Sequence, residues 1–426
     1  MINQGFERTA VNRIRLHVLP TDRFKTYAIS ANIGVPLAED DVTPVALLPF
    51  VLRRGTAKYP ETKKFREKLD DLFGAGFGFD IYKRGDNQIV QFRMDVINDQ
   101  FVEGRHDLLK QSLQFLGETL FAPALENGTL RGKYVESEKV TLQKRLEAIV
   151  NDKIKYAAER CIQEMCKDEP YRLNPLGKVT DLPSITPESL YTMYQRWLQN
   201  AVIDLYVAGN TTPDEVKSLV EAYFPMQSGQ TASYDMRTAF PEVQHVKRVE
   251  EQLDVTQGKL NMGLRSYVTY GDEAYPAALM YNGILGGYPH SKLFTNVREK
   301  ASLAYYAASR LDGHKGIITI QSGIEFENYE KAVDIIERQL ELMRQGDISD
   351  LEWMQTRAMI GNSLREMQDS AHEMISFDFN NMLTGKERTI PQLIAEIDQV
   401  DKQAVQRMAE QVKLDTIYFL RNKKGE

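Results

Sequence analysis

Histidine and cysteine are both scarce in this chain of 426 residues, which has six histidines and two cysteines. Two cysteines exclude a disulfide scaffold, and six histidines limit any metal or acid–base site built from imidazole. Cys161 and Cys166 lie five residues apart in a run that reads as a helix, and positions i and i+5 of a helix do not share a face. We therefore interpret both as buried small residues in a reducing compartment.

The sequence also lacks a targeting signal, a membrane span and an excess of positive charge. Residues 1–10 contain no basic segment that leads into an apolar run, and no run approaches the roughly 18 apolar residues that cross a bilayer. The 53 Lys and Arg against 60 Asp and Glu give a formal net charge of −7, so charge gives no reason to expect nucleic acid. We expect a cytoplasmic protein without membrane or nucleic-acid partners.

An internal repeat organises the chain. In the first copy, a charged turn leads into an alternating strand over 88–94 and then a helix over 107–120. In the second copy, a similar turn leads into a strand over 317–323 and a helix over 329–344. The repeat predicts an α+β fold with two homologous domains, each a mostly antiparallel sheet packed with helices.

The two copies are separated by a polar segment rich in Gly, Ser and Thr that has no periodicity. We predict an N-terminal domain over 1–228, a linker over 229–245 and a C-terminal domain over 246–426. Helix starts are marked in both halves by Thr186, which precedes a proline, and by Ser349, which has a glutamate three residues later.

The stretch 285–305 resembles a signature of the pitrilysin, or insulinase-like, family of zinc peptidases, which includes the mitochondrial processing peptidase. It reads Leu-Gly-Gly-Tyr-Pro-His-Ser-Lys-Leu-Phe-Thr-Asn-Val-Arg-Glu-Lys-Ala-Ser-Leu-Ala-Tyr. Shorter matches occur at 52–56, 185–190 and 207–210, so the resemblance covers nearly the whole chain. The resemblance implies the two-domain, processing-peptidase-like metallohydrolase fold.

The family's zinc motif, H-x-x-E-H on a helix of the first half, is degenerate here. In an alignment anchored on the match at 52–56, its positions fall on Ala46, Pro49 and Phe50, and the distal glutamate ligand falls on Arg145. None of these side chains is a metal ligand, and a permanent cation would repel a dication. The resemblance therefore implies no metal and no catalytic residue in this chain, with zinc expected in a partner subunit.

The family's substrate-binding Arg/Tyr pair is present as Arg298 and Tyr305. A guanidinium and a phenol can donate hydrogen bonds to a substrate carbonyl and to a developing oxyanion. The alternative is that Arg298 is an ion-pair residue on a helix surface and Tyr305 a core aromatic. In two-subunit members this pair belongs to the partner of the zinc subunit, so the resemblance implies a non-catalytic, substrate-binding subunit of a two-subunit zinc metallopeptidase acting on peptides.

The expected partners are a peptide substrate and either a homologous catalytic subunit, in a heterodimer, or a second copy, in a homodimer. The alternative that the chain is a structural or interaction protein with the same fold and no role in proteolysis stays open. A metallopeptidase with relocated ligands is disfavoured by the scattered histidines. A basic cluster near the degenerate motif is either a solvated surface or a docking patch for an acidic partner. Its members are Arg53, Arg54, Lys58, Lys63, Lys64, Arg66 and Lys68.

Overall fold

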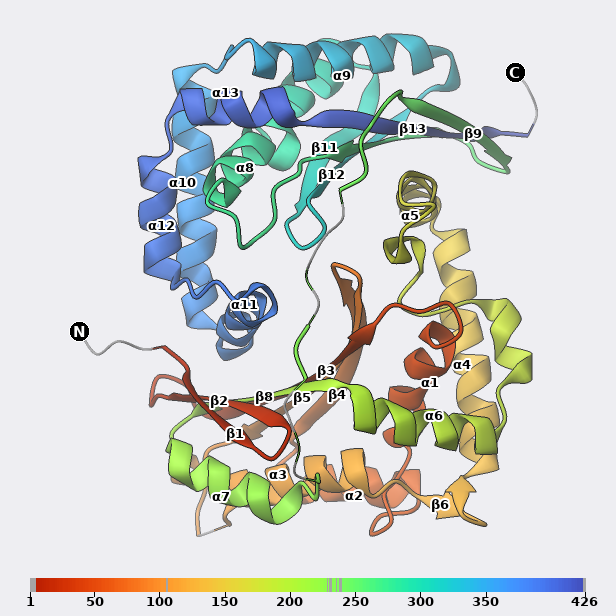
Figure 1. Cartoon of the computed structure of the whole chain (residues 1–426), viewed down its shortest axis with the longest axis vertical. Helices are drawn as coiled ribbons and strands as arrows, with labels where there is room; N and C mark the ends of the chain where they lie inside the picture. Colours follow the sequence, from red (N-terminus) through yellow and green to blue (C-terminus); the bar gives the residue numbers. More distant parts are fainter. Residues whose placement is uncertain are drawn as a thin grey trace. The chain divides into compact units, whose positions relative to one another are not determined.

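The computed structural model of the chain, shown in Figure 1, describes residues 5–104, 106–227, 229, 232–234, 236 and 240–423. Contacts between Cα atoms divide the chain into two compact units. Unit 1 comprises Met1–Glu147, Leu173–Asp235 and Ser370–Asp378, and unit 2 comprises Ala148–Arg172, Met236–Asp369 and Phe379–Glu426. The units are not continuous in sequence, and the division into domains 1–228 and 246–426 with a linker at 229–245 stays a prediction.

Unit 1 is built on a six-stranded sheet with the order β1-β2-β8-β3-β5-β4. All neighbouring strands are antiparallel except β2 and β8, which are parallel. Every residue of β8 is buried, so both faces of the sheet centre are covered. The strands are β1 (Glu7–Val11), β2 (Ile14–Pro20), β3 (Thr26–Pro36), β4 (Gly76–Arg84), β5 (Asn87–Ile97) and β8 (Val202–Gly209), and a separate hairpin joins β6 (Leu125–Glu126) to β7 (Thr129–Leu130).

The helices of unit 1 pack on this sheet and on one another. Helix α1 contacts β5 and α6, while α7 contacts α3 and the strands β1 and β2. Thr186 caps α6 by accepting a hydrogen bond from the backbone of Ser189, as its sequence predicted. The helices are α1 (Val42–Leu52), α2 (Thr62–Asp71), α3 (Leu108–Phe121), α4 (Gly132–Asn151, which continues into unit 2), α6 (Pro187–Asn200) and α7 (Pro213–Tyr223), with short 3-10 turns η1 (Asp99–Phe101) and η3 (Val179–Ser184).

Unit 2 is built on a five-stranded sheet with the order β11-β12-β10-β13-β9. Its neighbouring strands are antiparallel except β13 and β9, which are parallel. The strands are β9 (Lys247–Leu253), β10 (Gly258–Arg265), β11 (Ala304–Asp312), β12 (Ile317–Ile324) and β13 (Lys413–Asn422).

The two sheets repeat one topology. Taken from the β4 edge, unit 1 runs β4-β5-β3-β8-β2, and unit 2 runs β11-β12-β10-β13-β9 with the same pairing sense at every step. Strand β1 is an extra edge strand of unit 1. The predicted α+β fold with a repeated, mostly antiparallel sheet packed with helices is therefore confirmed, with one parallel pair in each sheet.

In unit 2, α5 covers the two central strands, β10 and β13. Ala157 and Cys161 of α5 pack with Tyr418 and Leu420 of β13, and both cysteines are buried, as predicted. Ser349 forms the predicted capping box at the start of α10. The helices are α5 (Lys153–Met165), α8 (Tyr275–Asn282), α9 (Tyr329–Arg344), α10 (Asp350–Glu366), α12 (Ile390–Gln399) and α13 (Lys402–Gln411); α11 (Ala371–Thr384) has residues in both units. Shorter segments are the π-helical η4 (Gly283–Gly287) and η5 (Phe294–Lys300) and the 3-10 turns η2 (Pro170–Arg172), η6 (Phe326–Asn328) and η7 (Met367–Asp369).

Among the residues that the structure describes, no helix is both long enough and apolar enough to cross a bilayer.

A buried set of charges attaches the end of α5 to the sheet of unit 2. The Arg265 guanidinium, 1% exposed, lies 2.6 Å from a carboxylate oxygen of Glu169 and 2.9 Å from one of Asp415. It also donates a 2.9 Å hydrogen bond to the carbonyl of Met165, the last residue of α5. The Lys315 ammonium approaches Glu169 to 2.8 Å. Two cations thus balance two carboxylates, which is the condition for burying charge at tolerable cost.

We expect Arg265→Leu to lower the free energy of unfolding by about 3 kcal/mol, because it leaves Glu169 and Asp415 without a cation they share. Chemical denaturation followed by circular dichroism measures this loss. The matched control is Arg421→Gln on β13, whose ion pair with Glu250 is partly exposed at both ends and should contribute at most about 1 kcal/mol. Equal effects of the two substitutions would contradict the structural role of Arg265.

Candidate functional site

The three positions of the degenerate metal motif lie in the buried helix α1. Ala46 is 0% exposed and Phe50 is 3% exposed, and Pro49 is also buried within the helix. Ten of the eleven residues of α1 are buried. The side chains of Ala46, Pro49 and Phe50 contain only carbon and hydrogen, so they offer no ligand to a metal ion.

Arg145 of α4 (Gly132–Asn151) contacts Phe50 of α1. Its guanidinium carbon is 5.9 Å from the centre of the Phe50 ring, which is the geometry of a cation–π contact. The motif position and the distal ligand position are therefore neighbours in space, occupied by a phenyl ring and a guanidinium. Across the residues that the structure describes, no group of three or more His, Cys, Asp or Glu side chains is arranged to hold a metal ion.

Arg53 extends the same cluster towards the edge strand β4. Its guanidinium carbon is 5.8 Å from the Phe50 ring centre and 5.1 Å from that of Phe79. The two rings meet edge to face, with their centres 4.7 Å apart. Sequence reasoning placed Arg53 in a basic cluster but did not identify Phe79, because residues on different elements share no local spacing.

Most members of that basic cluster are neutralised by neighbours. Arg54 lies 3.2 Å from Glu138, which is only 1% exposed. Three members, Arg53, Arg66 and Lys68, form no ion pair with any residue that the structure describes. The other contacts join Lys58 to Glu118, Lys63 and Lys64 to Glu67, and Lys68 to the side-chain amide of Gln111.

The predicted Arg/Tyr pair lies in unit 2, at the start of edge strand β11 and in the π-helical segment that precedes it. Arg298 is exposed, its guanidinium carbon lies 4.5 Å from the Phe294 ring centre, and it forms no ion pair within the described part of the chain. Tyr305 is 66% exposed. The alternative that Tyr305 is a core aromatic is therefore wrong, and the segments that carry the two residues pack against each other.

The phenol of Tyr305 donates a 3.1 Å hydrogen bond to the carboxylate of Glu325. This hydrogen bond, together with the charge of Glu325, raises the pKa of Tyr305 above its ordinary value. The group therefore keeps its proton near neutral pH and can act as a hydrogen-bond donor.

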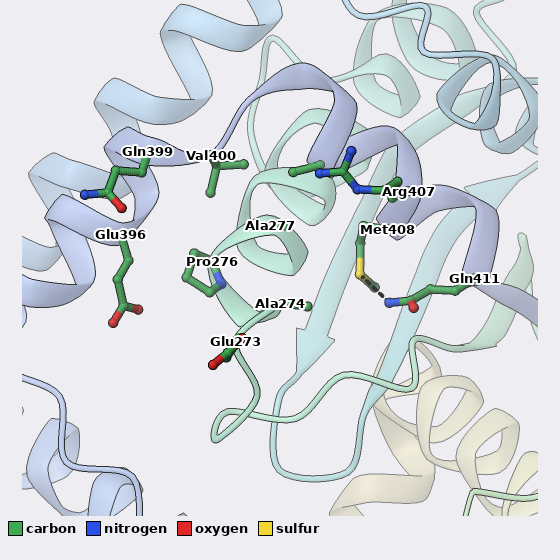
Figure 2. Close-up of a pocket in the computed structure, with 11 residues that line it drawn as sticks. Glu273, Ala274, Pro276, Ala277, Glu396, Gln399, Val400, Arg407, Met408 and Gln411 are labelled. Carbon is green, nitrogen blue, oxygen red and sulfur yellow. Dashed lines mark hydrogen bonds between the residues drawn. The ribbon is translucent and has the colours of Figure 1, made fainter.

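A cavity of about 430 Å³ lies in unit 2 among α8, α12 and α13 (Figure 2). Pro276 and Ala277 form one wall and Val400 and Met408 another, while Glu396, Gln399, Arg407 and Gln411 supply polar atoms. Its lining comes from three separate helices, and no motif in the sequence marks it.

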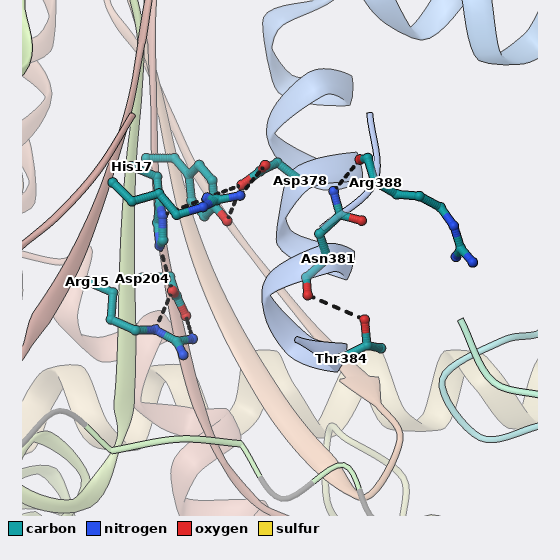
Figure 3. A network of polar contacts seen from close by, with 9 residues as sticks. Arg15, His17, Asp204, Asp378, Asn381, Thr384 and Arg388 are labelled. Atoms are coloured by element: carbon teal, nitrogen blue, oxygen red, sulfur yellow. Dashed lines mark hydrogen bonds and ion pairs between the residues drawn. The ribbon is translucent and has the colours of Figure 1, made fainter. Parts of the chain in front are cut away.

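A buried polar network crosses the sheet of unit 1 (Figure 3). Asp204 of β8 is 0% exposed, and its carboxylate accepts a 2.7 Å hydrogen bond from Nε of Arg15 and lies 2.8 Å from Nε2 of His17. Arg8 lies 3.1 Å from Nδ1 of His17 and forms two 2.9 Å bonds with Asp378 of α11. Because Arg8 can only donate, Nδ1 accepts and Nε2 carries the hydrogen that binds Asp204. Sequence reasoning missed this network because β2, β8 and α11 are distant in the chain.

Comparison with known proteins places the chain among peptidase-like proteins. A family model described as "Peptidase M16 inactive domain" matches residues 184–360. The "Probable inactive metalloprotease YmfF" of Bacillus subtilis (strain 168) is 41% identical over 409 residues, which are 96% of each chain. A solved structure described as a conserved protein from Enterococcus faecalis V583 is 31% identical, with a TM-score of 0.92 over 99% of this chain and 100% of that one. The structure of a peptidase M16 inactive domain from Pseudomonas fluorescens, 14% identical, covers 98% of each chain with a TM-score of 0.80 and shows the fold alone.

The Asp204 network predicts a specific dependence of stability on pH. Burial by itself raises the pKa of Asp204, but the hydrogen bond from His17 and the charge of Arg15 outweigh it and lower the pKa below its ordinary value. The stabilisation that the charged Asp204 contributes is therefore complete above the ordinary carboxyl pKa of about 3.9. It is lost as the pH falls through the lower pKa that Asp204 has in the folded state.

We expect Asp204→Asn to lower the unfolding free energy at pH 7 by about 3 kcal/mol and to flatten the loss of stability at acid pH. Urea denaturation between pH 7 and pH 3 measures both. Asp95→Asn is the control, since Asp95 is half exposed and pairs with the partly exposed His372. A variant at Asp204 that keeps the wild-type stability and its pH profile would contradict the assignment.

Proposed function

This chain belongs to the M16 peptidase family, and we propose that it is the non-catalytic, substrate-binding subunit of a two-subunit zinc metallopeptidase that acts on peptides. The family resemblance predicted from the sequence is confirmed, and the chain is a homologue of a probable inactive metalloprotease. The observation that carries the proposal is the exposure of Tyr305 and Arg298 on adjoining segments, combined with a motif that has no ligand atoms.

The residues at the degenerate motif do not fit a zinc ion. Ala46 and Phe50 supply only hydrocarbon, and the Arg145 guanidinium beside Phe50 is a fixed positive charge. A metal ion there would meet repulsion and no donor. Zinc and the catalytic base would therefore come from a homologous subunit that keeps the H-x-x-E-H sequence, and that subunit is the proposed partner.

Arg298 and Tyr305 would hold the peptide in this scheme. The Arg298 guanidinium lies over the Phe294 ring, and this contact restricts its motion. The Tyr305 phenol is exposed and protonated and can exchange its bond with Glu325 for one to a peptide carbonyl. Two such donors fix the orientation of a carbonyl group and stabilise negative charge that develops on its oxygen.

The test is a cleavage assay with the purified chain and a homologous subunit that contains an intact H-x-x-E-H sequence, for which the adjacent reading frame is the first candidate. We expect peptide cleavage only when both are mixed. Arg298→Ala and Tyr305→Phe should each lower kcat/KM of the mixture at least tenfold. Removal of one hydrogen-bond donor to a developing oxyanion typically lowers the rate by about 10²-fold.

Arg338→Ala is the matched control, because Arg338 is exposed on α9 and forms no ion pair with the described residues. Its mixture should cleave at the wild-type rate. Unchanged cleavage with both Arg298→Ala and Tyr305→Phe would remove the substrate-binding role. A stable homodimer that neither binds the catalytic homologue nor affects its activity would favour the alternative, a structural or interaction protein with this fold.

A further inference from the structure

Two arginines of unit 1 contact the same aromatic ring and have no described counterion. Arg53 and Arg145 are both exposed and both lie over the Phe50 ring, at 5.8 and 5.9 Å from its centre. Arg53 also lies over Phe79. The groups that contact them are aromatic rings, and neither forms an ion pair or a side-chain hydrogen bond within the part of the chain that the structure describes.

The surrounding charges do not neutralise this pair. The nearest arginine in sequence, Arg54, forms an ion pair with the buried Glu138. The remaining lysines of the basic cluster contact Glu118, Glu67 or Gln111. The cluster around Phe50 therefore retains two uncompensated positive charges in a chain whose net charge is −7.

The aromatic contacts prepare these guanidiniums for an anion. A guanidinium stacked on a ring loses part of its freedom before any ligand arrives, and its N–H donors lie at its edge, away from the ring face. A planar carboxylate matches this edge and can accept two parallel hydrogen bonds.

We propose that Arg53 and Arg145, on the Phe50–Phe79 platform, form a binding site for a peptide carboxylate. The carboxylate is supplied either by an acidic side chain or by the C-terminus of the peptide. The identification of the ligand as a peptide rests on the proposed function, whereas the anion site itself rests on the geometry. Nucleic acid is disfavoured as the source of the anion, because two charges in an acidic chain give little electrostatic attraction to a polyphosphate.

Binding is tested on the full-length chain alone, by fluorescence anisotropy with three octapeptides labelled at the N-terminus. The first contains glutamates and an amidated C-terminus, the second contains glutamines and a free C-terminus, and the third contains glutamines and an amidated C-terminus. We expect the first or the second to bind at least about tenfold more tightly than the third, since charged hydrogen bonds discriminate on this scale. Which of the two binds identifies the source of the carboxylate.

Arg53→Gln/Arg145→Gln should abolish this preference, and Arg145→Gln alone should reduce it at least threefold. Arg66→Gln is the control, because it removes an exposed, unpaired arginine from the same basic cluster and should leave the affinity within twofold of wild type. Thermal melts of all variants verify that they fold. If the double variant does not fold, Arg145→Gln alone tests the site.

The proposal is overturned if the wild-type chain shows no preference among the peptides, if Arg66→Gln weakens binding as much as the double substitution, or if a single-stranded oligonucleotide of equal charge binds more tightly than either acidic peptide. Because no partner protein is present, a negative result leaves the cleavage experiment with Arg298 and Tyr305 unaffected. A failed cleavage experiment likewise leaves the carboxylate site standing.

Discussion

Both faces of the central strands are covered in each unit, so a charged group buried on them needs a polar partner inside the protein. In unit 1 Asp204 meets His17 and Arg15. In unit 2 Arg265 meets Glu169 and Asp415. Leaving such a charged group buried without a partner costs more free energy than burying it in an ion pair. The need for a partner therefore joins strands and helices that are far apart in the chain.

Against that background the unpaired cations are informative. Arg298 and the Arg53–Arg145 pair are exposed, rest on aromatic rings and have no described acidic partner. The contact with a ring distinguishes them from exposed arginines such as Arg66 and Arg338, and the two proposed binding roles rest on this difference. At the degenerate motif, Phe50 and Arg145 stand where metal-binding relatives have zinc ligands. This replacement removes the metal ligands, and in the proposed anion site it supplies a ring and a guanidinium for a carboxylate.

Local pattern predicted much of the fold. The predicted strands at 88–94 and 317–323 lie within β5 and β12, and the predicted helix 329–344 coincides with α9. The parallel pairing of β2 with β8, and of β9 with β13, was not predicted, because it depends on contacts between distant segments. The site positions came from family alignment. Their surroundings, such as Phe79 beside Arg53 and the exposure of Tyr305, required the structure, because residue type alone suggests that an aromatic is buried.

The central claim is that this polypeptide has lost its metal site while keeping the peptidase fold. The most direct test is elemental analysis of the purified chain after equilibration with zinc and removal of the unbound metal, with the homologous H-x-x-E-H subunit treated in parallel. Zinc far below one atom per chain here, and close to one per chain in the homologue, is the predicted result. Zinc close to one atom per molecule of this chain would contradict the claim.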